Sequence, residues 1–129
     1  MRGYLLDTNA TLFALVTPER VSDAAREAVA RGPCYLSLIV YWEIVIMSMK
    51  GTLDVGDPRS WWDDSLNALR LLPLMVTPRH VTAILDLPDH HRDPFDRALV
   101  AQAITEDLVL ITADTALKAY QTSGLKLLW

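Results

Sequence analysis

Short apolar runs punctuate the chain, and between them apolar residues recur at helical spacing. Uninterrupted apolar runs of a few residues are typical of strands buried on both faces of a parallel sheet. One of these runs contains Pro73, which a strand tolerates only at an edge or a bulge. The runs lie at residues 4–6, 34–36, 71–76, 108–111 and 125–129. They predict a parallel sheet of four or five strands, with the last run as an edge strand.

Helix-capping residues and prolines mark the segments between the predicted strands. Ser22 and Ser37 are suitable N-caps for the residues that follow them, and Pro78 and Pro94 are placed as first-turn residues of helices. Residues 7–9 are expected to form a polar loop after the first strand. Helices are predicted at 23–31, 38–49, 58–70 and 115–121 and in the segments that the two prolines open.

Strands that alternate with helices predict an α/β fold, a three-layer α/β/α arrangement around a parallel sheet. Ligands of such folds gather at the carboxyl ends of the strands. The chain has 129 residues, of which 51% are hydrophobic. This is enough apolar material for one compact core but too little length for two ordinary domains. Residues 1–129 are therefore expected to form a single domain.

The sequence favours a cytoplasmic protein. Its single cysteine, Cys34, lies in an apolar run and can form no disulfide within the chain, which fits a reducing compartment. Nowhere do about 18 apolar residues run together, so no membrane-spanning helix is expected. The N-terminal apolar run is interrupted by Asp7 and lacks a small-residue cleavage site, so no signal peptide is expected either.

The formal net charge of -4 has the wrong sign for a protein that holds nucleic acid by a large basic surface. This objection weakens if several acids are gathered at one metal site, because bound divalent cations reverse the charge there. The positions of the acids in the fold therefore decide whether a nucleic acid can be the partner.

Four acidic residues fall where the predicted fold would bring them together. Asp7 follows the first predicted strand and Asp114 follows the fourth, so both lie at carboxyl ends of strands. Asp96 lies in the first turn of a helix, and Glu43 lies in the helix after the second strand. Glu43 is the only acid of the segment LSLIVYWEIVIMSM, where an isolated carboxylate requires a cation or another partner.

Each acid also has an ordinary structural explanation. Asp96 could interact favourably with the helix dipole, and Asp7 and Asp114 could cap the loops after their strands. The coincidence of four carboxylates instead favours a hard cation, because Mg²⁺ and Mn²⁺ prefer carboxylate and water oxygens and crowded acids repel one another. One ion, or two about 3.5–4 Å apart, could activate water for phosphodiester hydrolysis. The pattern predicts a hydrolytic nuclease.

Four segments together resemble the PIN-domain family, and within it the VapC-type toxins. They are LLDTN, YWEI, RDPFDRALVAQA and LITADTALKAY, in the family's order and spacing over nearly the whole chain. The resemblance implies a PIN fold and a Mg²⁺-dependent (or Mn²⁺-dependent) endoribonuclease, the toxin of a type II toxin–antitoxin system. It implies that the metal-binding catalytic acids are Asp7, Glu43, Asp96 and Asp114. It also implies supporting roles for Asp93, Thr8, Asn9 and Thr112.

The chain departs from this resemblance after the YWEI segment. Where relatives commonly have a lysine and then Gly-Lys-Leu, the chain has Met47 and then Gly51-Thr52-Leu53. Lys50 could substitute as a phosphate-facing cation, although a solvated lysine at a helix end is the simpler interpretation. Substrate contact on this side of the site is left open.

Two arginines and two histidines accompany the acidic loop. Arg92 and Arg97 are predicted substrate-binding residues, because a guanidinium can form forked hydrogen bonds to phosphate. The alternative is that they pair with nearby aspartates. His90 and His91 could act as bases or ligands, but their position in a loop favours ordinary surface residues.

The resemblance also implies partners. These are RNA as substrate, a cognate VapB-like antitoxin that covers a hydrophobic groove and places a basic residue in the acidic site, and a second copy of the chain in a homodimer. Trp61 and Trp62 belong to an apolar stripe of the helix at 58–70. Two adjacent tryptophans cannot point the same way, so one of them is expected at a surface used by another chain.

Other functions that use acids and Mg²⁺ require patterns that the sequence lacks. A receiver domain needs an acidic pair near the first strand, a central phosphoacceptor aspartate and a late lysine. A phosphatase of the haloacid-dehalogenase type needs Asp-x-Asp where the chain has Asp7-Thr8-Asn9. Two alternatives remain: a PIN-like domain that acts on DNA, because the same site hydrolyses either backbone, and a catalytically silent binding module.

Overall fold

A five-stranded parallel sheet forms the centre of the protein, as predicted. The computed structural model describes residues 2–129, and the strands lie in the order β3-β2-β1-β4-β5. Every neighbouring pair is parallel, and Leu5 of the central strand lies beside Tyr35 on one side and Leu110 on the other. The strands are β1 (Tyr4–Leu6), β2 (Cys34–Ser37), β3 (Leu72–Leu74), β4 (Val109–Ile111) and β5 (Lys126–Leu128).

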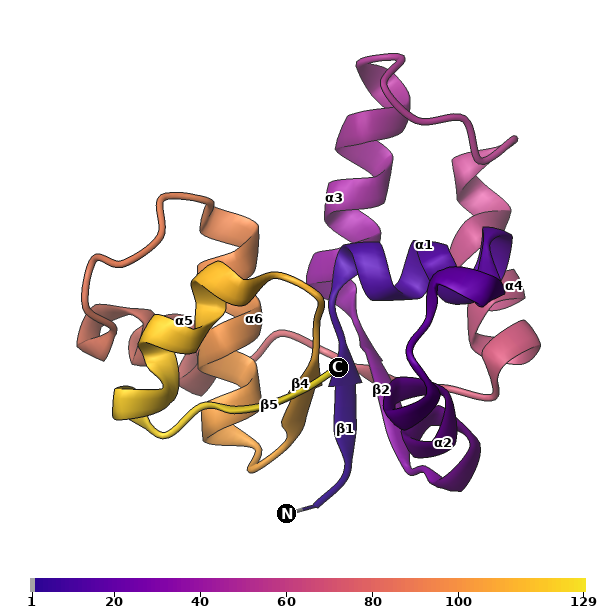
Figure 1. Ribbon diagram of the computed structural model, residues 1–129. Coiled ribbons are helices and arrows are strands. Elements are labelled where there is room, and N and C mark those ends of the chain that lie inside the picture. The colour runs from indigo at the N-terminus through magenta and orange to yellow at the C-terminus, as the bar shows by residue number, and fades with distance from the viewer. Residues whose placement is uncertain (1) are drawn as a thin grey trace.

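Helices cover the sheet on both sides, which confirms the three-layer α/β/α prediction (Figure 1). In this view α5 and α6 lie to the left of the strands and α1, α2 and α4 to their right, while α3 rises from the top of β2. The α-helices are α1 (Thr8–Val16), α2 (Asp23–Arg31), α3 (Leu38–Met49), α4 (Pro58–Leu69), α5 (Pro78–Ala83) and α6 (Pro94–Thr105). The 3-10 helices are η1 (Pro18–Arg20), η2 (Ile84–Asp86) and η3 (Thr115–Ser123).

The chain leaves the central strand β1 in two directions. β2 and β3 continue the sheet on one side, and after α6 the chain crosses to β4 and β5 on the other side. The carboxyl ends of β1 and β4 therefore flank a switch point, where the connections diverge and open α/β sheets bind their ligands. Asp7 follows β1 directly, and Asp114 follows β4 after a two-residue spacer. The topology thus brings two of the predicted metal-binding acids to this edge.

Side-chain caps begin several helices, including one that the sequence pattern did not predict. Ser22 and Ser37 accept backbone N–H groups in the first turns of α2 and α3, as expected. Residues 7–9 do not form a polar loop, because Asp7 caps α1 and accepts the N–H of Ala10 at 2.8 Å. The sequence of α1, TNATLFALV, is apolar around most of the helix, so it lacks the amphipathic periodicity that reveals a surface helix.

The two outer strands of the sheet explain why a proline is tolerated in one of the predicted strands. Pro73 lies within β3, an edge strand, where a sheet tolerates proline. β5 is the opposite edge strand, as predicted. The short helix expected at 115–121 is a 3-10 helix that continues to Ser123. Within residues 2–129, no helix has the length and apolar character needed to cross a bilayer.

A buried polar network joins β2 to α6. Gln102 of α6 is fully buried, and the hydroxyl of Ser37 at the end of β2 donates to its Oε1 at 2.5 Å. The Nε2 of Gln102 donates to the carbonyl of Met75 at 3.4 Å and lies 3.3 Å from Nδ1 of His80. Removal of one member of such a network leaves buried polar groups without partners, which is more costly than the loss of a surface hydrogen bond.

Replacement of Gln102 with leucine is expected to lower the free energy of unfolding by about 1–3 kcal/mol, because Ser37 and Met75 lose a buried partner. Urea denaturation followed by tryptophan fluorescence measures the change. Gln121→Leu is the control, since Gln121 is exposed on η3 and its replacement should change the free energy by less than about 0.5 kcal/mol. Equal effects of the two substitutions would contradict the importance of the network.

Candidate active site

Carboxylates from separate parts of the chain meet beyond the carboxyl ends of β1 and β4. They line a small pocket of about 90 Å³. The pocket contains the four acids predicted to bind metal and all but one of the predicted supporting residues. Its lining residues are Asp7, Thr8, Asn9, Glu43, Met47, Asp93, Asp96 and Asp114.

Asp7 is the deepest of these acids, with only 5% of its surface exposed. One carboxylate oxygen accepts the N–H of Ala10, and the side chain of Thr112 also forms a hydrogen bond to Asp7. Burial raises the pKa of Asp7 from 3.8 to about 6, although these hydrogen bonds lower it. The nearby charges of Asp114 and Glu43 add to the upward shift.

Glu43 extends from α3 and faces the first turn of α1. Its carboxylate accepts a hydrogen bond from the hydroxyl of Thr8. Burial raises the pKa of Glu43, the hydrogen bond from Thr8 lowers it, and the charge of Asp93 raises it again. Asp93 is the N-cap of α6 and accepts the N–H groups of Phe95 and Asp96 at 2.9 and 3.4 Å. It therefore fixes the start of the helix that presents Asp96.

Asp96 and Asp114 face each other across the pocket. Burial raises the pKa of Asp96 from 3.8 to about 7, with further upward contributions from Asp93, Glu43 and Asp7. Asp114 caps η3 by accepting the N–H of Ala116 at 3.0 Å, and Thr112 in turn accepts the N–H of Asp114 at 3.0 Å. Thr112 thus contacts both acids that follow the strands, which is the position expected of a supporting residue.

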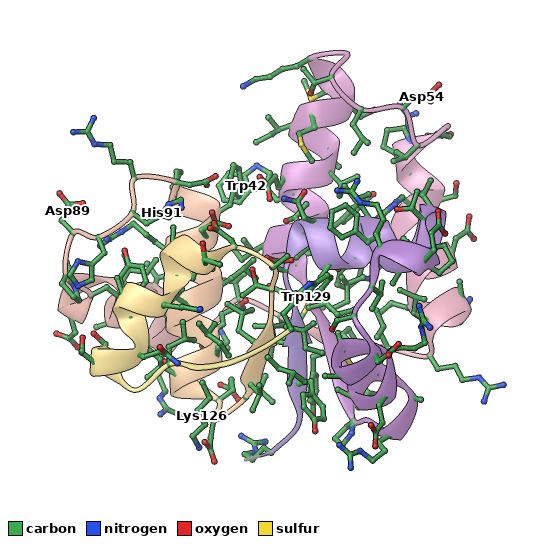
Figure 2. The ribbon with its side chains drawn as sticks, viewed as in Figure 1. Trp42, Asp54, Asp89, His91, Lys126 and Trp129 are labelled. Carbon is green, nitrogen blue, oxygen red and sulfur yellow. The ribbon has the colours of Figure 1, made fainter. Side chains whose placement is uncertain are left out.

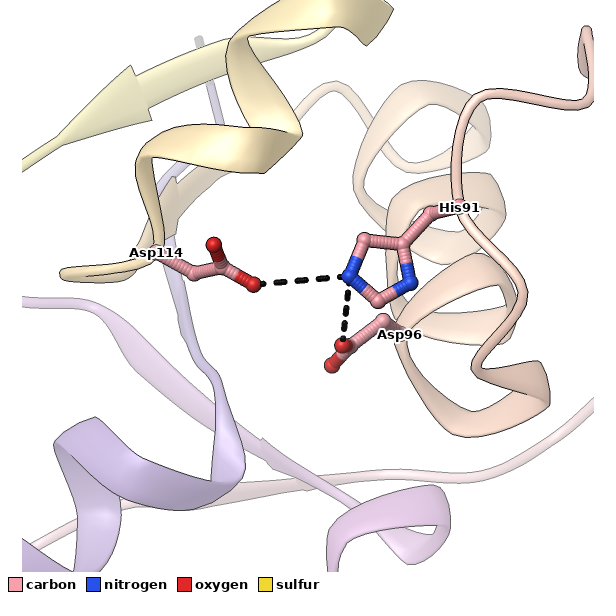
Figure 3. Close-up of side chains that lie close together, drawn as sticks. All are labelled: His91, Asp96 and Asp114. Carbon is pink, nitrogen blue, oxygen red and sulfur yellow. Dashed lines mark ion pairs between the residues drawn. The ribbon is translucent and has the colours of Figure 1, made fainter.

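His91 is a member of the site that the sequence analysis did not assign to it. Its Nε2 lies 3.5 Å from a carboxylate oxygen of Asp96 and 3.6 Å from one of Asp114 (Figure 3). The expectation that His91 is an ordinary surface residue is corrected by this geometry. His90 is exposed, and its ring packs edge-on against Tyr120 at 5.2 Å. Only the loop conformation distinguishes the two adjacent histidines.

The donor set fits a hard divalent cation. Crowded carboxylates with upward-shifted pKa values indicate more negative charge than the pocket can solvate, and a cation relieves that excess. Asp96 and Asp114 each offer an oxygen, and these oxygens and Nε2 of His91 lie within 4.8 Å of one another. Carboxylate oxygens at this spacing suit Mg²⁺ or Mn²⁺.

Residues 4–122 match the family model described as the PIN domain. The chain belongs to the PIN-domain family. The match runs from β1 to within η3 and includes the acids that line the pocket. The resemblance stated from the sequence is thereby confirmed at the level of the family. A comparison with curated proteins found no match.

Solved structures with the same PIN fold include chains of bacterial toxin–antitoxin systems. A chain of VapBC2 from Rickettsia felis, bound to a promoter DNA fragment, is 18% identical, with a TM-score of 0.71 over 97% of this chain and 96% of that chain. DNA-bound VapBC from Salmonella typhimurium gives 18% identity and a TM-score of 0.71 over 99% and 98%. VapBC-5 from Mycobacterium tuberculosis is a member of the VapBC family of toxin–antitoxin systems. Its matched chain is 16% identical, with a TM-score of 0.63 over 99% of this chain and 98% of that chain.

Arg97 of this PIN domain supports the loop before α6. Its Nη1 donates to the carbonyl of Pro88 at 3.0 Å and to the hydroxyl of Tyr120 at 3.2 Å. Its Nη2 donates to the carbonyls of Ile84 and Leu87 at 3.5 and 3.4 Å. A guanidinium engaged in this way has little capacity left for phosphate. The geometry therefore favours a structural role for Arg97, in place of the predicted substrate contact or an ion pair with an aspartate.

The remaining cationic candidates of this PIN domain lie at the surface. Arg92 is exposed on the same loop as His91, and its substrate contact stays a prediction. Lys50 is the exposed C-cap of α3, which agrees with the solvated interpretation. Met47, at the position where the stated resemblance would lead one to expect a lysine, lines the acidic pocket. The wall of the pocket on the α3 side is therefore uncharged at this position.

The exposed tryptophan of the PIN domain is Trp42 and not a member of the adjacent pair. Trp61 is buried and Trp62 is half-buried, and both rings stack on Tyr41 at 6.0 and 5.6 Å. Trp42 is 58% exposed and packs edge-on against Phe95. Figure 2 shows Trp42 and His91 toward the upper end of the molecule, whereas Lys126 lies at the lower end. Trp42 directly precedes Glu43 and Phe95 directly precedes Asp96, so this pair of rings lies next in the chain to two acids of the pocket.

The raised pKa of Asp7 predicts that the metal-free protein loses stability as the pH rises. The carboxyl group ionises near 3.8 in the unfolded chain but near about 6 in the folded protein, so the unfolded state releases its proton first. Asp7→Asn cannot ionise and keeps an oxygen that can cap α1. In EDTA at pH 8 this variant is expected to be more stable than the wild type by on the order of 2 kcal/mol, with the difference lost near pH 3, below the pKa of the unfolded chain.

Urea denaturation at a series of pH values measures this difference. Asp63→Asn is the control, because Asp63 is exposed on α4 and its replacement should shift the free energy by less than about 0.5 kcal/mol at every pH. A wild-type protein that gains stability relative to Asp7→Asn as the pH rises would contradict the assigned environment of Asp7.

Proposed function

We propose that this PIN domain is a metal-dependent endoribonuclease and the toxin of a type II toxin–antitoxin system. The observation that supports the nuclease activity is the pocket in which Asp7, Glu43, Asp96 and Asp114 converge. The observation that supports the toxin role is the fold shared with chains of VapBC systems over nearly the full length. Its action on RNA would take place in the cytoplasm.

Each acid has a defined part in the proposed site. Asp7, Glu43, Asp96 and Asp114 would hold Mg²⁺ or Mn²⁺. The ion would supply an activated water and charge neutralisation for direct hydrolysis of a phosphodiester, without a covalent enzyme intermediate. Thr8 orients Glu43 through its hydroxyl. Such outer contacts fix the direction in which a ligand presents its oxygens.

The supporting residues position the remaining acids. Thr112 contacts both Asp7 and Asp114, and Asp93 holds the first turn of α6. Asn9 lies exposed at the rim of the pocket, where its amide can reach a bound water or the substrate. Arg92 is the exposed cation closest in sequence to the site, and we assign it to the substrate phosphate.

Two kinds of protein partner complete the proposal: a VapB-like antitoxin and a second copy of the chain in a homodimer. The toxin–antitoxin systems among the similar structures support the first partner. Exposed large apolar side chains that line one hollow support protein contacts in general, since Trp42 is 58% exposed, Val76 36% and Val81 57%. Groups of exposed apolar side chains are typical of surfaces that another chain covers.

The first test is the cleavage of total cellular RNA by the purified protein in the presence of Mg²⁺. We expect discrete RNA fragments from the wild type, and a rate at least about a hundredfold lower from Asp7→Asn, because removal of a metal ligand should cost more than removal of an outer-shell partner. Asp63→Asn, which changes an exposed acid of α4, should cleave like the wild type.

The same assay distinguishes the alternatives. Cleavage of single-stranded or duplex DNA with RNA left intact would support the DNA-directed PIN nuclease. Intact RNA and DNA with all variants would support the silent binding module. Full RNA cleavage by Asp7→Asn would refute the assignment of the acidic pocket as the catalytic site.

Chelation tests the metal requirement separately. Activity is expected to disappear in EDTA and to return on addition of excess Mg²⁺ or Mn²⁺, since carboxylates are the only anionic ligands that line the pocket. Ca²⁺ serves as a comparison ion, because it binds oxygen ligands with longer and more flexible geometry. RNA cleavage that is unaffected by EDTA would exclude the metal-dependent mechanism.

A further inference from the structure

His91 occupies the space between two of the proposed metal ligands. Its Nε2 approaches one oxygen of Asp96 at 3.5 Å and one oxygen of Asp114 at 3.6 Å, and the dashed lines in Figure 3 meet at this single ring nitrogen. The His91 side chain is only 21% exposed. A half-buried imidazole at this place is either a third ligand of the ion or a group that interacts with the acids themselves.

The other ring nitrogen decides between these roles. The backbone N–H of Asp93 donates to Nδ1 of His91 at 3.1 Å. Nδ1 is therefore an acceptor without a proton, and in the neutral ring the proton resides on Nε2. A metal-binding histidine has the opposite arrangement, because its metal-bound nitrogen is bare and its other N–H donates to an acceptor. The opposite orientation of the ring is unfavourable, because rotation by 180° would place a C–H group, which cannot accept a hydrogen bond, against the N–H of Asp93.

The same arrangement occurs at His80, away from the acidic pocket. The N–H of Thr77 donates to Nδ1 of His80 at 3.0 Å, and its Nε2 lies 2.9 Å from a carboxylate oxygen of Glu106. His80 is thus held by a backbone N–H at one nitrogen and donates to a carboxylate from the other. His91 repeats the backbone hydrogen bond to Nδ1, and its Nε2 lies at the longer distances of 3.5 and 3.6 Å from two carboxylate oxygens.

The loop that contains His91 is held in place on both sides. The carbonyl of Pro88 accepts hydrogen bonds from Arg97 at 3.0 Å and from the N–H of His90 at 2.9 Å. These two bonds come from the Arg97 side chain and the His90 backbone, so neither depends on the imidazole of His90. Movement of His91 away from the acids therefore requires rotation of its side chain, with loss of the hydrogen bond from Asp93, and not only a shift of a free loop.

We propose that His91, which directs its Nε2–H group toward Asp96 and Asp114 at 3.5 and 3.6 Å, competes with the divalent cation for these acids and is not a ligand of that cation. The inference rests on the proposed function, because it assumes that these acids bind metal. An ion on the two oxygens that face His91 would lie directly opposite the positive end of the Nε2–H bond. The ion and the inward-facing ring cannot share these oxygens, so His91 must turn away when the ion binds.

This competition lowers the affinity for metal. When a group must first be displaced, the apparent affinity for the ion is the intrinsic affinity multiplied by the fraction of molecules in which the site is open. The displaced interactions are a backbone hydrogen bond to Nδ1 and two charge-assisted contacts of Nε2, which together correspond to roughly a tenfold change in affinity. His91 is therefore expected to set the cation concentration at which the pocket fills.

The affinity for Mn²⁺ tests the proposal without reference to activity. Mn²⁺ binding to the metal-free wild type, His91→Ala and His90→Ala is measured at pH 8 by electron paramagnetic resonance of the free ion and by calorimetry. We expect His91→Ala to bind Mn²⁺ roughly tenfold more tightly than the wild type, and the control His90→Ala to bind within about twofold of it. Weaker or unchanged binding by His91→Ala would overturn the proposal, and weaker binding would identify His91 as a ligand.

The same binding measurement distinguishes failure of the His91 proposal from failure of the proposed metal-dependent function. Mn²⁺ binding by the wild type and His90→Ala, with no gain in His91→Ala, would refute the competition and leave the metal site intact. If none of the three proteins binds Mn²⁺, the metal-dependent function is refuted and this inference with it.

The tautomer of His91 provides a second measurement on the unaltered protein. Nitrogen-15 NMR of the labelled, metal-free wild type at pH 8, assigned with the two alanine variants, is expected to show a protonated Nε2 and a bare Nδ1 for His91. With saturating Mg²⁺ the displaced ring loses the hydrogen bond from Asp93, so its nitrogen-15 shifts should move toward those of a free imidazole that exchanges between its two tautomers. A proton on Nδ1 in the metal-free protein, or a bare Nε2 that coordinates the ion in saturating Mg²⁺, would overturn the proposal.

Discussion

Repulsion between carboxylates at the carboxyl ends of β1 and β4 is the constraint to which the rest of the site responds. The structure counters this repulsion in part with helix termini. Asp7, Asp93 and Asp114 are the N-caps of α1, α6 and η3, so three helices begin at the pocket. Backbone N–H groups and the positive ends of these helices favour negative charge there. The pKa values of Asp7 and Asp96 are nevertheless raised, chiefly by burial and further by the neighbouring acids, so the helix termini leave negative charge that a bound cation would neutralise.

The two explanations that the sequence offered for the aspartates are therefore compatible. Asp7 caps α1 with one carboxylate oxygen, and Asp114 caps η3 in the same way. A carboxylate has two oxygens and about four lone-pair positions, so a capping bond leaves acceptor capacity for an ion. The cap also restricts the rotation of the side chain, and a metal ligand that is already oriented loses less entropy on binding. Capping is thus part of how this fold prepares the site.

The predictable parts of the molecule are those that depend on local sequence. Apolar runs revealed the strands, and the two aspartates could be placed because Asp7 follows one run directly and Asp114 follows another after two residues. α1 was missed because its apolar residues surround most of the helix. The positions of His91 and Arg97 could not be derived, since they depend on how the loop 87–93 packs between η2, α6 and η3. A pattern read along one segment contains no information about side chains that meet across several segments.

The net charge of -4 also has a different meaning once the acids are placed. Five of the 16 acidic residues line the pocket, and the remaining acids are nearly balanced by the 12 lysines and arginines. The acidity of the chain is therefore concentrated at one place, and the surface elsewhere is close to neutral. Bound divalent cations would remove most of the barrier to a polyanion at this place. A basic side chain from another protein could neutralise the same carboxylates, so a cation, an inhibitor and His91 would all act on one pocket by the same electrostatic means.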